Sequence, residues 1–291
     1  MWLQISLTVD KSRAPLIELL FENLGAQAVT LGDAGDEPML EPGPGEMPLW
    51  QATRVTGLFA GTTDPDELRS AVNQALSTDA GRSLALERLE DRDWERSWLD
   101  LFKPMRFGRR LWIRPGGTAI DQADAVIVDL DPGLAFGTGT HPTTALCLAW
   151  LDGHDLAGRR VVDFGCGSGI LGIAALKLGA RSVVAVDHDP QALIATRDNA
   201  ERNAVGDRLQ TVAGSELESV QADVVLANIL ANVLVDLGPR IAPLAGRGGQ
   251  LVLSGLLEDQ ATGVANAYRP AFTFAPPQTR EGWALLHGVR A

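Results

Sequence analysis

The feature that most constrains this sequence is a regular alternation of two hydrophobic periods between residues 121 and 291. Short apolar runs typical of strands alternate there with longer segments of helical spacing. This alternation predicts a parallel sheet with helices on both faces. We expect strands at 125–130, 160–164, 182–186, 209–212, 222–227, 250–253, 271–274 and 283–289. We expect helices at 142–151, 170–178, 191–204, 233–244 and 257–267.

The last two expected strands modify this arrangement. No helical segment separates 271–274 from 283–289, so we expect a hairpin at the sheet edge in which one strand runs opposite to the others. The predicted fold of 121–291 is therefore α/β and doubly wound, with a mostly parallel sheet and one reversed edge strand.

The first 90 residues show a different order of elements. Their periodicity reads as strand, helix, strand, strand, helix and strand, which is the split unit of a small α+β, ferredoxin-like domain. Residues 91–120 are rich in aromatic residues, and Trp94, Trp98 and Phe102 recur at the spacing of one helical face. We expect three parts: a substrate-recognition domain at 1–90, a connector at 91–120, and a catalytic domain at 121–291.

The net charge of −12 is unevenly distributed. Residues 1–90 hold 14 acidic and 6 basic side chains, while residues 91–120 hold 4 and 7. Because an acidic surface repels phosphate backbones, stable nucleic-acid binding is disfavoured. A basic protein partner fits this charge better, although negative charge also serves solubility alone.

Other sequence features exclude several classes of protein. No apolar run approaches the roughly 18 to 20 residues that cross a bilayer, so we expect a cytoplasmic monomer that does not bind membranes. Cys147 and Cys166 are too few for a disulfide framework, and we expect both to be reduced. The four histidines are scattered without ligand spacing, so we expect no metal site.

A glycine turn follows the strand expected at 160–164. Gly165, Gly167 and Gly169 allow the backbone to approach a ligand, and the next helix presents amide donors at its N-terminus. The overlapping segment 167–172 also has the dinucleotide spacing G-x-G-x-x-G, with Asp187 at the distance that this fingerprint requires. A nicotinamide cofactor and S-adenosyl-L-methionine therefore both remain open for this turn.

Three polar residues at strand ends distinguish these cofactors unequally. Asp163 precedes the glycines, where it would repel a pyrophosphate but attract the ammonium and sulfonium groups of S-adenosyl-L-methionine. Asp187 suits ribose hydroxyls in either cofactor. Asn228 places an amide at the end of the fourth strand, at the expected position of methyl transfer. With the reversed strand, these features favour a class I methyltransferase domain.

Four stretches resemble the bacterial ribosomal protein L-eleven methyltransferase (PrmA) family. They are 136–144 (Phe-Gly-Thr-Gly-Thr-His-Pro-Thr-Thr), which is the most specific, 162–171, 198–203 and 227–231. The resemblance covers residues 91–291, whereas residues 1–90 agree in predicted architecture. It implies cofactor contacts at Thr144, Gly165, Asp187 and Asn228, and the residues themselves add Asp163 and Gly167.

The resemblance also implies an activity. The family transfers methyl groups from S-adenosyl-L-methionine to amino groups, namely lysine side chains and the N-terminal amine, of a large-subunit ribosomal protein. Such a displacement needs an aligned, deprotonated amine, so we assign Asn228 a positioning role and name no general base. We interpret His141 as a helix-start residue in preference to a proton acceptor.

Three alternatives remain open from the sequence. The first is a methyltransferase that acts on another translation-related protein or on RNA. The second is an NAD-dependent oxidoreductase, which the dinucleotide spacing at 167–172 permits. The third is a ligand-sensing protein with a degenerate pocket.

Overall fold

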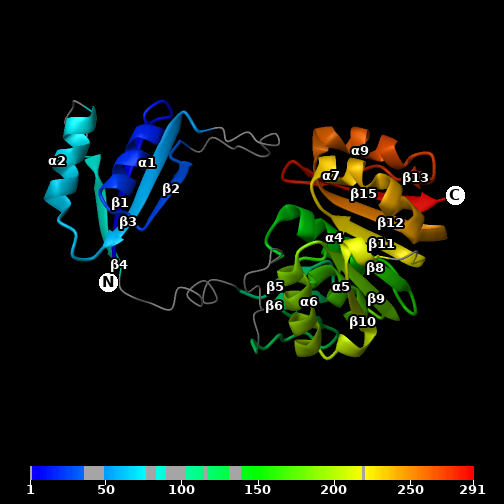
Figure 1. Cartoon of the computed structure of the whole chain (residues 1–291). Coiled ribbons are helices and arrows are strands. Elements are labelled where there is room, and N and C mark those ends of the chain that lie inside the picture. Colours follow the sequence, from blue (N-terminus) through cyan, green and yellow to red (C-terminus); the bar gives the residue numbers. More distant parts are fainter. Residues whose placement is uncertain are drawn as a thin grey trace. The chain divides into compact units, whose positions relative to one another are not determined.

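A computed structural model of the chain describes residues 2–35, 49–76, 83–89, 103–114, 117–130, 139–217 and 220–291. The chain forms two compact units, Met1–Ser97 and Trp98–Ala291 (Figure 1). The helical face predicted for Trp94, Trp98 and Phe102 lies outside the described residues.

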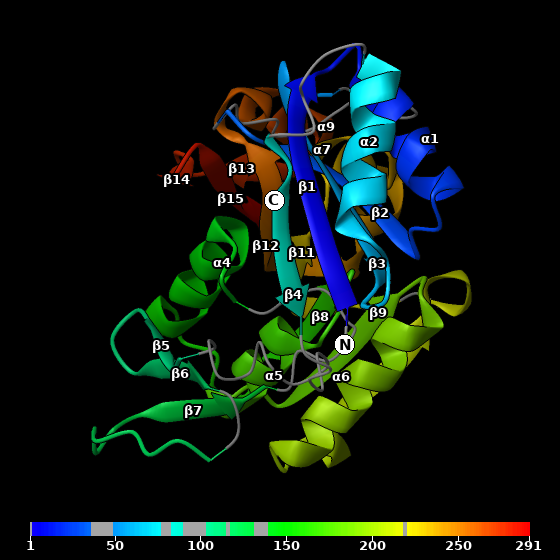
Figure 2. The ribbon, with the colours of Figure 1, turned by 90° about the vertical axis from the view of Figure 1, so that its left-hand side faces the viewer.

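The first unit is an antiparallel sheet with the strand order β2-β3-β1-β4. Its elements are β1 (Trp2–Asp10), α1 (Ala14–Asn23), β2 (Ala28–Asp33), β3 (Ala52–Ala60), α2 (Pro65–Leu76) and β4 (Ala85–Leu89). Leu3, Ile5 and Leu7 alternate along β1 on its buried face, because successive strand residues point to opposite sides. Helices α1 and α2 cover this face (Figure 2). The strand order is the one that a split β-α-β unit produces.

The second unit is built on an eight-stranded sheet of order β10-β9-β8-β11-β12-β15-β13, with β14 paired to β15. Its strands are β8 (Arg160–Phe164), β9 (Ser182–Asp187), β10 (Leu209–Ala213), β11 (Ala222–Asn228), β12 (Ala245–Leu257), β13 (Phe272–Phe274), β14 (Gln278–Arg280) and β15 (Trp283–Arg290). Strands β8 to β12 are parallel to one another, whereas β15 is antiparallel to β12, β13 and β14. The reversed strand therefore lies one position inside the edge, between β12 and β13.

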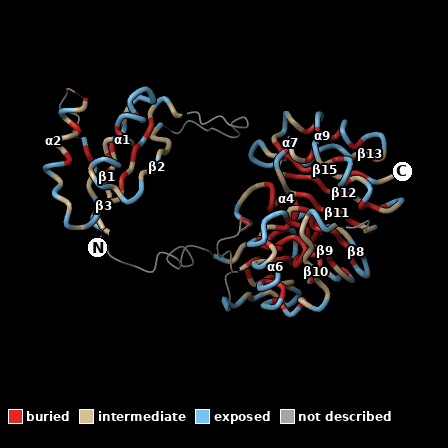
Figure 3. Tube along the Cα trace, viewed as in Figure 1, coloured by how far each residue is buried: buried red, intermediate tan, exposed pale blue. Residues whose placement is uncertain are grey.

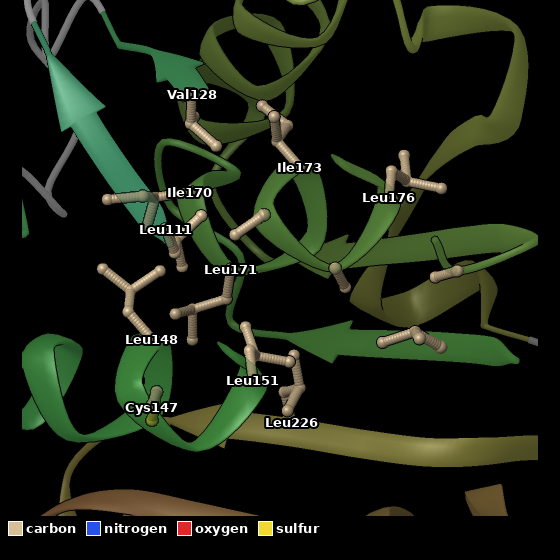
Figure 4. Packing of buried hydrophobic residues seen from close by; sticks show 14 of the residues in the cluster. Leu111, Val128, Cys147, Leu148, Leu151, Ile170, Leu171, Ile173, Leu176 and Leu226 are labelled. Atoms are coloured by element: carbon tan, nitrogen blue, oxygen red, sulfur yellow. The ribbon is translucent and has the colours of Figure 1, made fainter. Parts of the chain in front are cut away.

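Helices cover both faces of this sheet. Helices α4 (Pro142–Gly153), α5 (Ile170–Lys177) and α6 (Pro190–Arg202) share one core, and Figure 4 shows how α4 and α5 meet within it. Helices α7 (Ala231–Asp236), α8 (Gly238–Ile241) and α9 (Ala261–Tyr268) share the core on the opposite face. The sheet between the two layers is buried, and exposed residues lie on the outside (Figure 3).

The helix expected at 233–244 is interrupted. It begins earlier as α7, continues as the short helix α8, and ends in the 3-10 turn Ala242–Leu244. Pro239 and Pro243 lie within this stretch, and a proline inside a helix lacks the N–H group that would bond to the preceding turn.

A second, smaller sheet in this unit was not predicted. Strands β5 (Met105–Phe107) and β6 (Leu111–Arg114) lie within the predicted connector at 91–120, and β7 (Val126–Asp129) pairs with β6 in parallel. The strand expected at 125–130 thus belongs to this smaller sheet and not to the main sheet. Leu111 and Ile113 are fully buried beside α4, so residues 105–114 form part of the core of the second unit.

Candidate cofactor site

The carboxyl ends of three neighbouring strands place the predicted site residues at one level. Phe164, the last residue of β8, pairs with Val186 on β9 and with Ala227 on β11. The next residue of each strand is therefore Gly165, Asp187 or Asn228. Because parallel strands end at the same edge, Asp187 and Asn228 flank the glycine turn from opposite sides.

The turn at 165–169 is shaped by its glycines and anchored to β9. The N–H groups of Gly165 and Cys166 donate to the carbonyl oxygen of Val186 at 2.7 and 3.0 Å. Gly165 has a φ of +76°, and a Cβ atom there would collide with the side chain of Ile229. This position therefore requires glycine both for its backbone conformation and for the space it leaves.

Asp187 ends β9 and supports the turn. One carboxylate oxygen, Oδ2, accepts a hydrogen bond from Gly167 N at 3.0 Å, and Oδ1 accepts one from Asp189 N at 3.0 Å. A carboxylate has about four acceptor sites, so Oδ2 retains capacity for a further donor, while Oδ1 also lies 3.3 Å from Nδ1 of the exposed His188. Asp187 thus holds Gly167 directly, while the preceding residue Val186 holds Gly165, and the carboxylate at this strand end can bind a ligand with adjacent hydroxyl groups.

Asn228 ends β11 and carries a buried atom without a partner. Its Nδ2 donates to Thr144 Oγ1 on α4 at 3.2 Å. Its Oδ1 is buried and accepts no hydrogen bond within the part of the chain that the structure describes. Since a buried acceptor without a donor costs roughly 1 to 3 kcal/mol, this oxygen is suited to bind an N–H or O–H group of a ligand.

Asp163 lies beneath the turn, within the packing between β8 and α5. The residue is 1% exposed, and its Oδ2 accepts a hydrogen bond from Gly172 N at 2.9 Å. Burial raises the pKa of this carboxyl group to about 7, while the bond from Gly172 opposes the rise and the charge of Asp187 adds to it. The cofactor contact predicted for Asp163 stays a prediction, since the contact that the structure gives is to α5.

His141 caps the N-terminus of α4. Its Nδ1 accepts from Thr143 N at 3.4 Å and lies 2.7 Å from Thr143 Oγ1. Its ring meets the edge of Trp283 at a centroid distance of 4.6 Å, and burial lowers its pKa. His141 is thus the N-cap of α4, which agrees with its interpretation as a helix-start residue.

Sequence reasoning missed two residues on α6 that touch the turn. Thr196 and Asn199 lie 29 and 31 residues from the carbonyl groups that they contact. Asn199 belongs to the stretch 198–203 that carries the family resemblance, but its role could not be read from spacing. Phe136, Gly137 and Thr138 of the most specific stretch lie outside the described residues.

The described residues hold neither a metal cluster nor a membrane-spanning helix. No cluster of three or more His, Cys, Asp or Glu side chains suited to a metal ion occurs among the described residues. In the same part of the chain, no helix has both the length and the apolar character needed to cross a membrane.

Comparisons with known proteins identify the family of this chain. A family model described as Ribosomal protein L11 methyltransferase (PrmA) matches residues 1–291. Two proteins named Ribosomal protein L11 methyltransferase are similar to this chain over nearly their whole length. The one from Methylococcus capsulatus is 50% identical over 291 residues, covering 100% of this chain and 99% of that protein. The one from Aeromonas hydrophila is 52% identical over 288 residues, covering 99% and 98%.

One solved structure is also similar. It is the ribosomal protein L11 methylase from Lactobacillus delbrueckii subsp. bulgaricus, with a TM-score of 0.59 and 30% identity over 65% of this chain and 99% of that one. The family match over the full length, together with the strand ends that carry Gly165, Asp187 and Asn228, shows that this chain belongs to the ribosomal protein L11 methyltransferase family.

Proposed function

We propose that this chain transfers methyl groups from S-adenosyl-L-methionine to amino groups of ribosomal protein L11, namely lysine side chains and the N-terminal amine. The names of relatives about 50% identical over the whole chain support the reaction and the substrate. The observation that carries the proposal is the buried Oδ1 of Asn228, which has no partner among the described residues and lies at the edge where the methyl group would be transferred.

The residues at the site fit S-adenosyl-L-methionine. Asp187 offers two acceptor oxygens for ribose hydroxyls, and Gly165 and Gly167 let the backbone approach without a Cβ atom. Thr144 lies beside Asn228 and is proposed to bind the same ligand, while Asp163 lies below the turn and adds negative charge there only as the pH rises through about 7. The bound cofactor supplies a methyl group on a positively charged sulfur, which is already an activated leaving group.

Asn228 is proposed to orient the amine of the substrate. Its Nδ2 donates to Thr144, which restrains the amide group, and we propose that Oδ1 is the atom that meets the substrate. An N–H of the substrate donates to this oxygen, which directs the nitrogen lone pair toward the methyl group. Lysine has a pKa near 10.4 in water, so removal from water on binding favours the neutral amine that can attack.

The first unit is proposed to recognise the protein substrate. Residues 1–90 hold 14 acidic and 6 basic side chains, which suits a basic ribosomal protein. We propose that the enzyme acts as a monomer in the cytoplasm, where such a substrate is made. Light scattering during size-exclusion chromatography tests the monomer.

The decisive experiment measures methylation directly. Purified L11 is incubated with the protein and S-adenosyl-L-methionine carrying a labelled methyl group, and intact and peptide mass spectrometry locate the label. We expect label on lysines and the N-terminal amine, with a rate that falls about 10²-fold or more in Asn228→Ala.

The matched control for that experiment is Asn266→Ala, an exposed asparagine on α9, which should retain the activity. Absence of label with the natural protein, or label unaffected by Asn228→Ala, would contradict the proposal. Calorimetry with S-adenosylhomocysteine and NAD covers the oxidoreductase alternative, because tight binding of NAD alone would reject a methyl-donor site.

A further inference from the structure

Helix α6 holds the carbonyl groups of the glycine turn at 165–169, whereas β9 holds its N–H groups. Thr196 Oγ1 donates to the carbonyl oxygen of Gly167 at 3.0 Å, and Asn199 Nδ2 donates to that of Ser168 at 3.0 Å. Both side chains are buried, with exposures of 0% for Thr196 and 2% for Asn199. Two successive peptide groups of the turn are therefore fixed from the side of α6.

Thr196 both donates a hydrogen bond to the turn and packs against it. Its hydroxyl has one hydrogen and lies 3.0 Å from the carbonyl oxygen of Gly167 and 3.3 Å from Cys166 Sγ. The carbonyl is the stronger acceptor, because burial raises the pKa of the Cys166 thiol and keeps it neutral. The methyl carbon Cγ2 of Thr196 lies 2.9 Å from the place that a Cβ atom on Gly169 would occupy, so the side chain also fills the space beside the turn.

The turn needs such restraint because its own residues supply little. Gly165, Gly167 and Gly169 have φ values of +76°, +53° and +79°, and glycine loses more conformational freedom on ordering than any other residue. If the turn is already ordered, the affinity for the ligand is not reduced by the entropy cost of ordering it. If the turn is loose, that cost is incurred on binding and lowers the affinity. The peptide bond between Gly167 and Ser168 is trans, so the N–H of Ser168 points opposite to the carbonyl of Gly167. Because that carbonyl faces α6, the N–H faces away from α6.

We propose that Thr196, assisted by Asn199, is a positioning residue for the cofactor. It does not contact the cofactor itself but orders the glycine turn in the conformation that binds it. This inference rests on the proposed use of the turn to bind S-adenosyl-L-methionine. Its specific consequence is that loss of the Thr196 hydroxyl weakens cofactor binding more than it slows methyl transfer at saturating cofactor.

The test uses two substitutions at Thr196 in the full chain. Thr196→Val keeps the shape but removes the donor, and we expect the Kd for S-adenosylhomocysteine by calorimetry to rise about tenfold, with a less favourable binding entropy. Thr196→Ser restores the hydroxyl and should bind within about twofold of the natural protein, since the donor is back. The KM for S-adenosyl-L-methionine should follow the Kd, while kcat stays near its original value.

The matched control is Thr53→Val in the first unit. Thr53 is also fully buried, and its Oγ1 donates to the carbonyl oxygen of Trp50 at 2.6 Å, so the substitution removes a bond of the same kind within the other unit. It should leave the Kd for S-adenosylhomocysteine unchanged. Asn199→Asp provides a second variant if Thr196→Val does not fold, and it should also raise the Kd because it removes the donor to Ser168.

Each outcome decides between defined alternatives. A folded Thr196→Val or Asn199→Asp protein with the original Kd overturns the positioning role. A Thr196→Ser protein as weak as Thr196→Val overturns it as well, because the hydroxyl would then be irrelevant. Failure of the natural protein to bind S-adenosylhomocysteine would reject the proposed function instead, so the two failures are distinguishable.

Discussion

At the scale of single residues, the carboxyl group of Asp163 is buried, and burial disfavours its ionised form. Burial raises its pKa to about 7, against an ordinary value of 3.8. Burial also raises the pKa of Cys147, to about 12, so that thiol does not titrate in the same pH range. Asp163 is therefore the buried group at this site whose protonation changes near neutral pH.

The raised pKa of Asp163 predicts how stability changes with pH. Between pH 4 and pH 7 the folded protein holds a proton on Asp163 that the unfolded chain has lost, so this contribution is fully present below about pH 4 and is lost as the pH rises through about 7. Asp163→Asn removes this dependence. From pH 5 to pH 8, the free energy of unfolding should fall by about 2 to 3 kcal/mol more in the natural protein than in the variant.

Urea denaturation at several pH values measures that difference. Asn also offers an oxygen to Gly172 N, so the variant preserves the one hydrogen bond that the carboxylate makes in the described structure. Stability curves that stay parallel from pH 5 to pH 8 would mean that Asp163 is ionised throughout this range.

Asp187 predicts a loss of cofactor affinity. Asp187→Ala removes the proposed ribose acceptors and the bond from Gly167 N, so binding of S-adenosylhomocysteine should weaken by roughly 1.5 to 3 kcal/mol in calorimetry. Asp155→Ala is the matched control. Asp155 is exposed and precedes the N-terminal end of β8, opposite to the end that carries the site, and in the structure as described it bonds only to the nearby Ala157 N. Equal binding by a folded Asp187→Ala protein would remove this residue from the site.

At the scale of elements, α6 connects the small sheet to the main one. Asn203 Oδ1 accepts from Asp129 N at 2.8 Å, and its Nδ2 donates to Asp129 O at 2.7 Å and to Asn199 O at 2.8 Å. A single side chain therefore bonds to the end of β7 as a neighbouring strand would. Because Asn199 also bonds to the glycine turn and Asn203 follows the last residue of α6, the C-terminal end of α6 links the turn to β7 within one helical turn.

The link between α6 and β7 predicts a local loss of stability. Asn203→Ala leaves the N–H and carbonyl groups of Asp129 without this partner, so the free energy of unfolding should fall by about 2 kcal/mol in chemical denaturation. Hydrogen exchange at Asp129 N should also accelerate. Asn266→Ala, at an exposed helical position, should change stability by less than about 0.5 kcal/mol. Unchanged exchange at Asp129 would show that β7 is held by its own sheet alone.

At the scale of the whole molecule, the charge distribution predicts a salt effect confined to the protein substrate. Residues 1–90 hold 14 acidic and 6 basic side chains. The distance over which exposed charges interact falls from about 10 Å at 0.1 M salt to about 3 Å at 1 M. Between 0.05 and 0.5 M sodium chloride, the KM for L11 should rise several-fold, because steering between exposed charges weakens with ionic strength.

Affinity for S-adenosylhomocysteine serves as the internal control for the salt effect. Asp187 is 8% exposed and Gly167 N donates to its carboxylate, so this contact is shielded from salt, and the Kd should change little. A KM for L11 that is constant over this range would exclude electrostatic recognition by residues 1–90.

Sequence alone determined the parallel core and the meeting of the site residues. Val183 to Asp187 and Ala222 to Asn228 read as apolar strands that end in a polar residue, and parallel strands end at one edge. Gly165, Asp187 and Asn228 could therefore be placed together without coordinates. These features follow from local periodicity, which indicates the buried face of each strand or helix.

Only the tertiary structure decided the features that depend on distant partners. Strand β7 joins β6, and not the main sheet, and Asn203 bonds to it across 74 residues of sequence. The reversed strand β15 lies between β12 and β13, and Thr196 contacts the glycine turn from another helix. Local periodicity indicates which side of an element is apolar, but it does not indicate which element will cover that side, because that choice depends on packing between segments far apart in the chain.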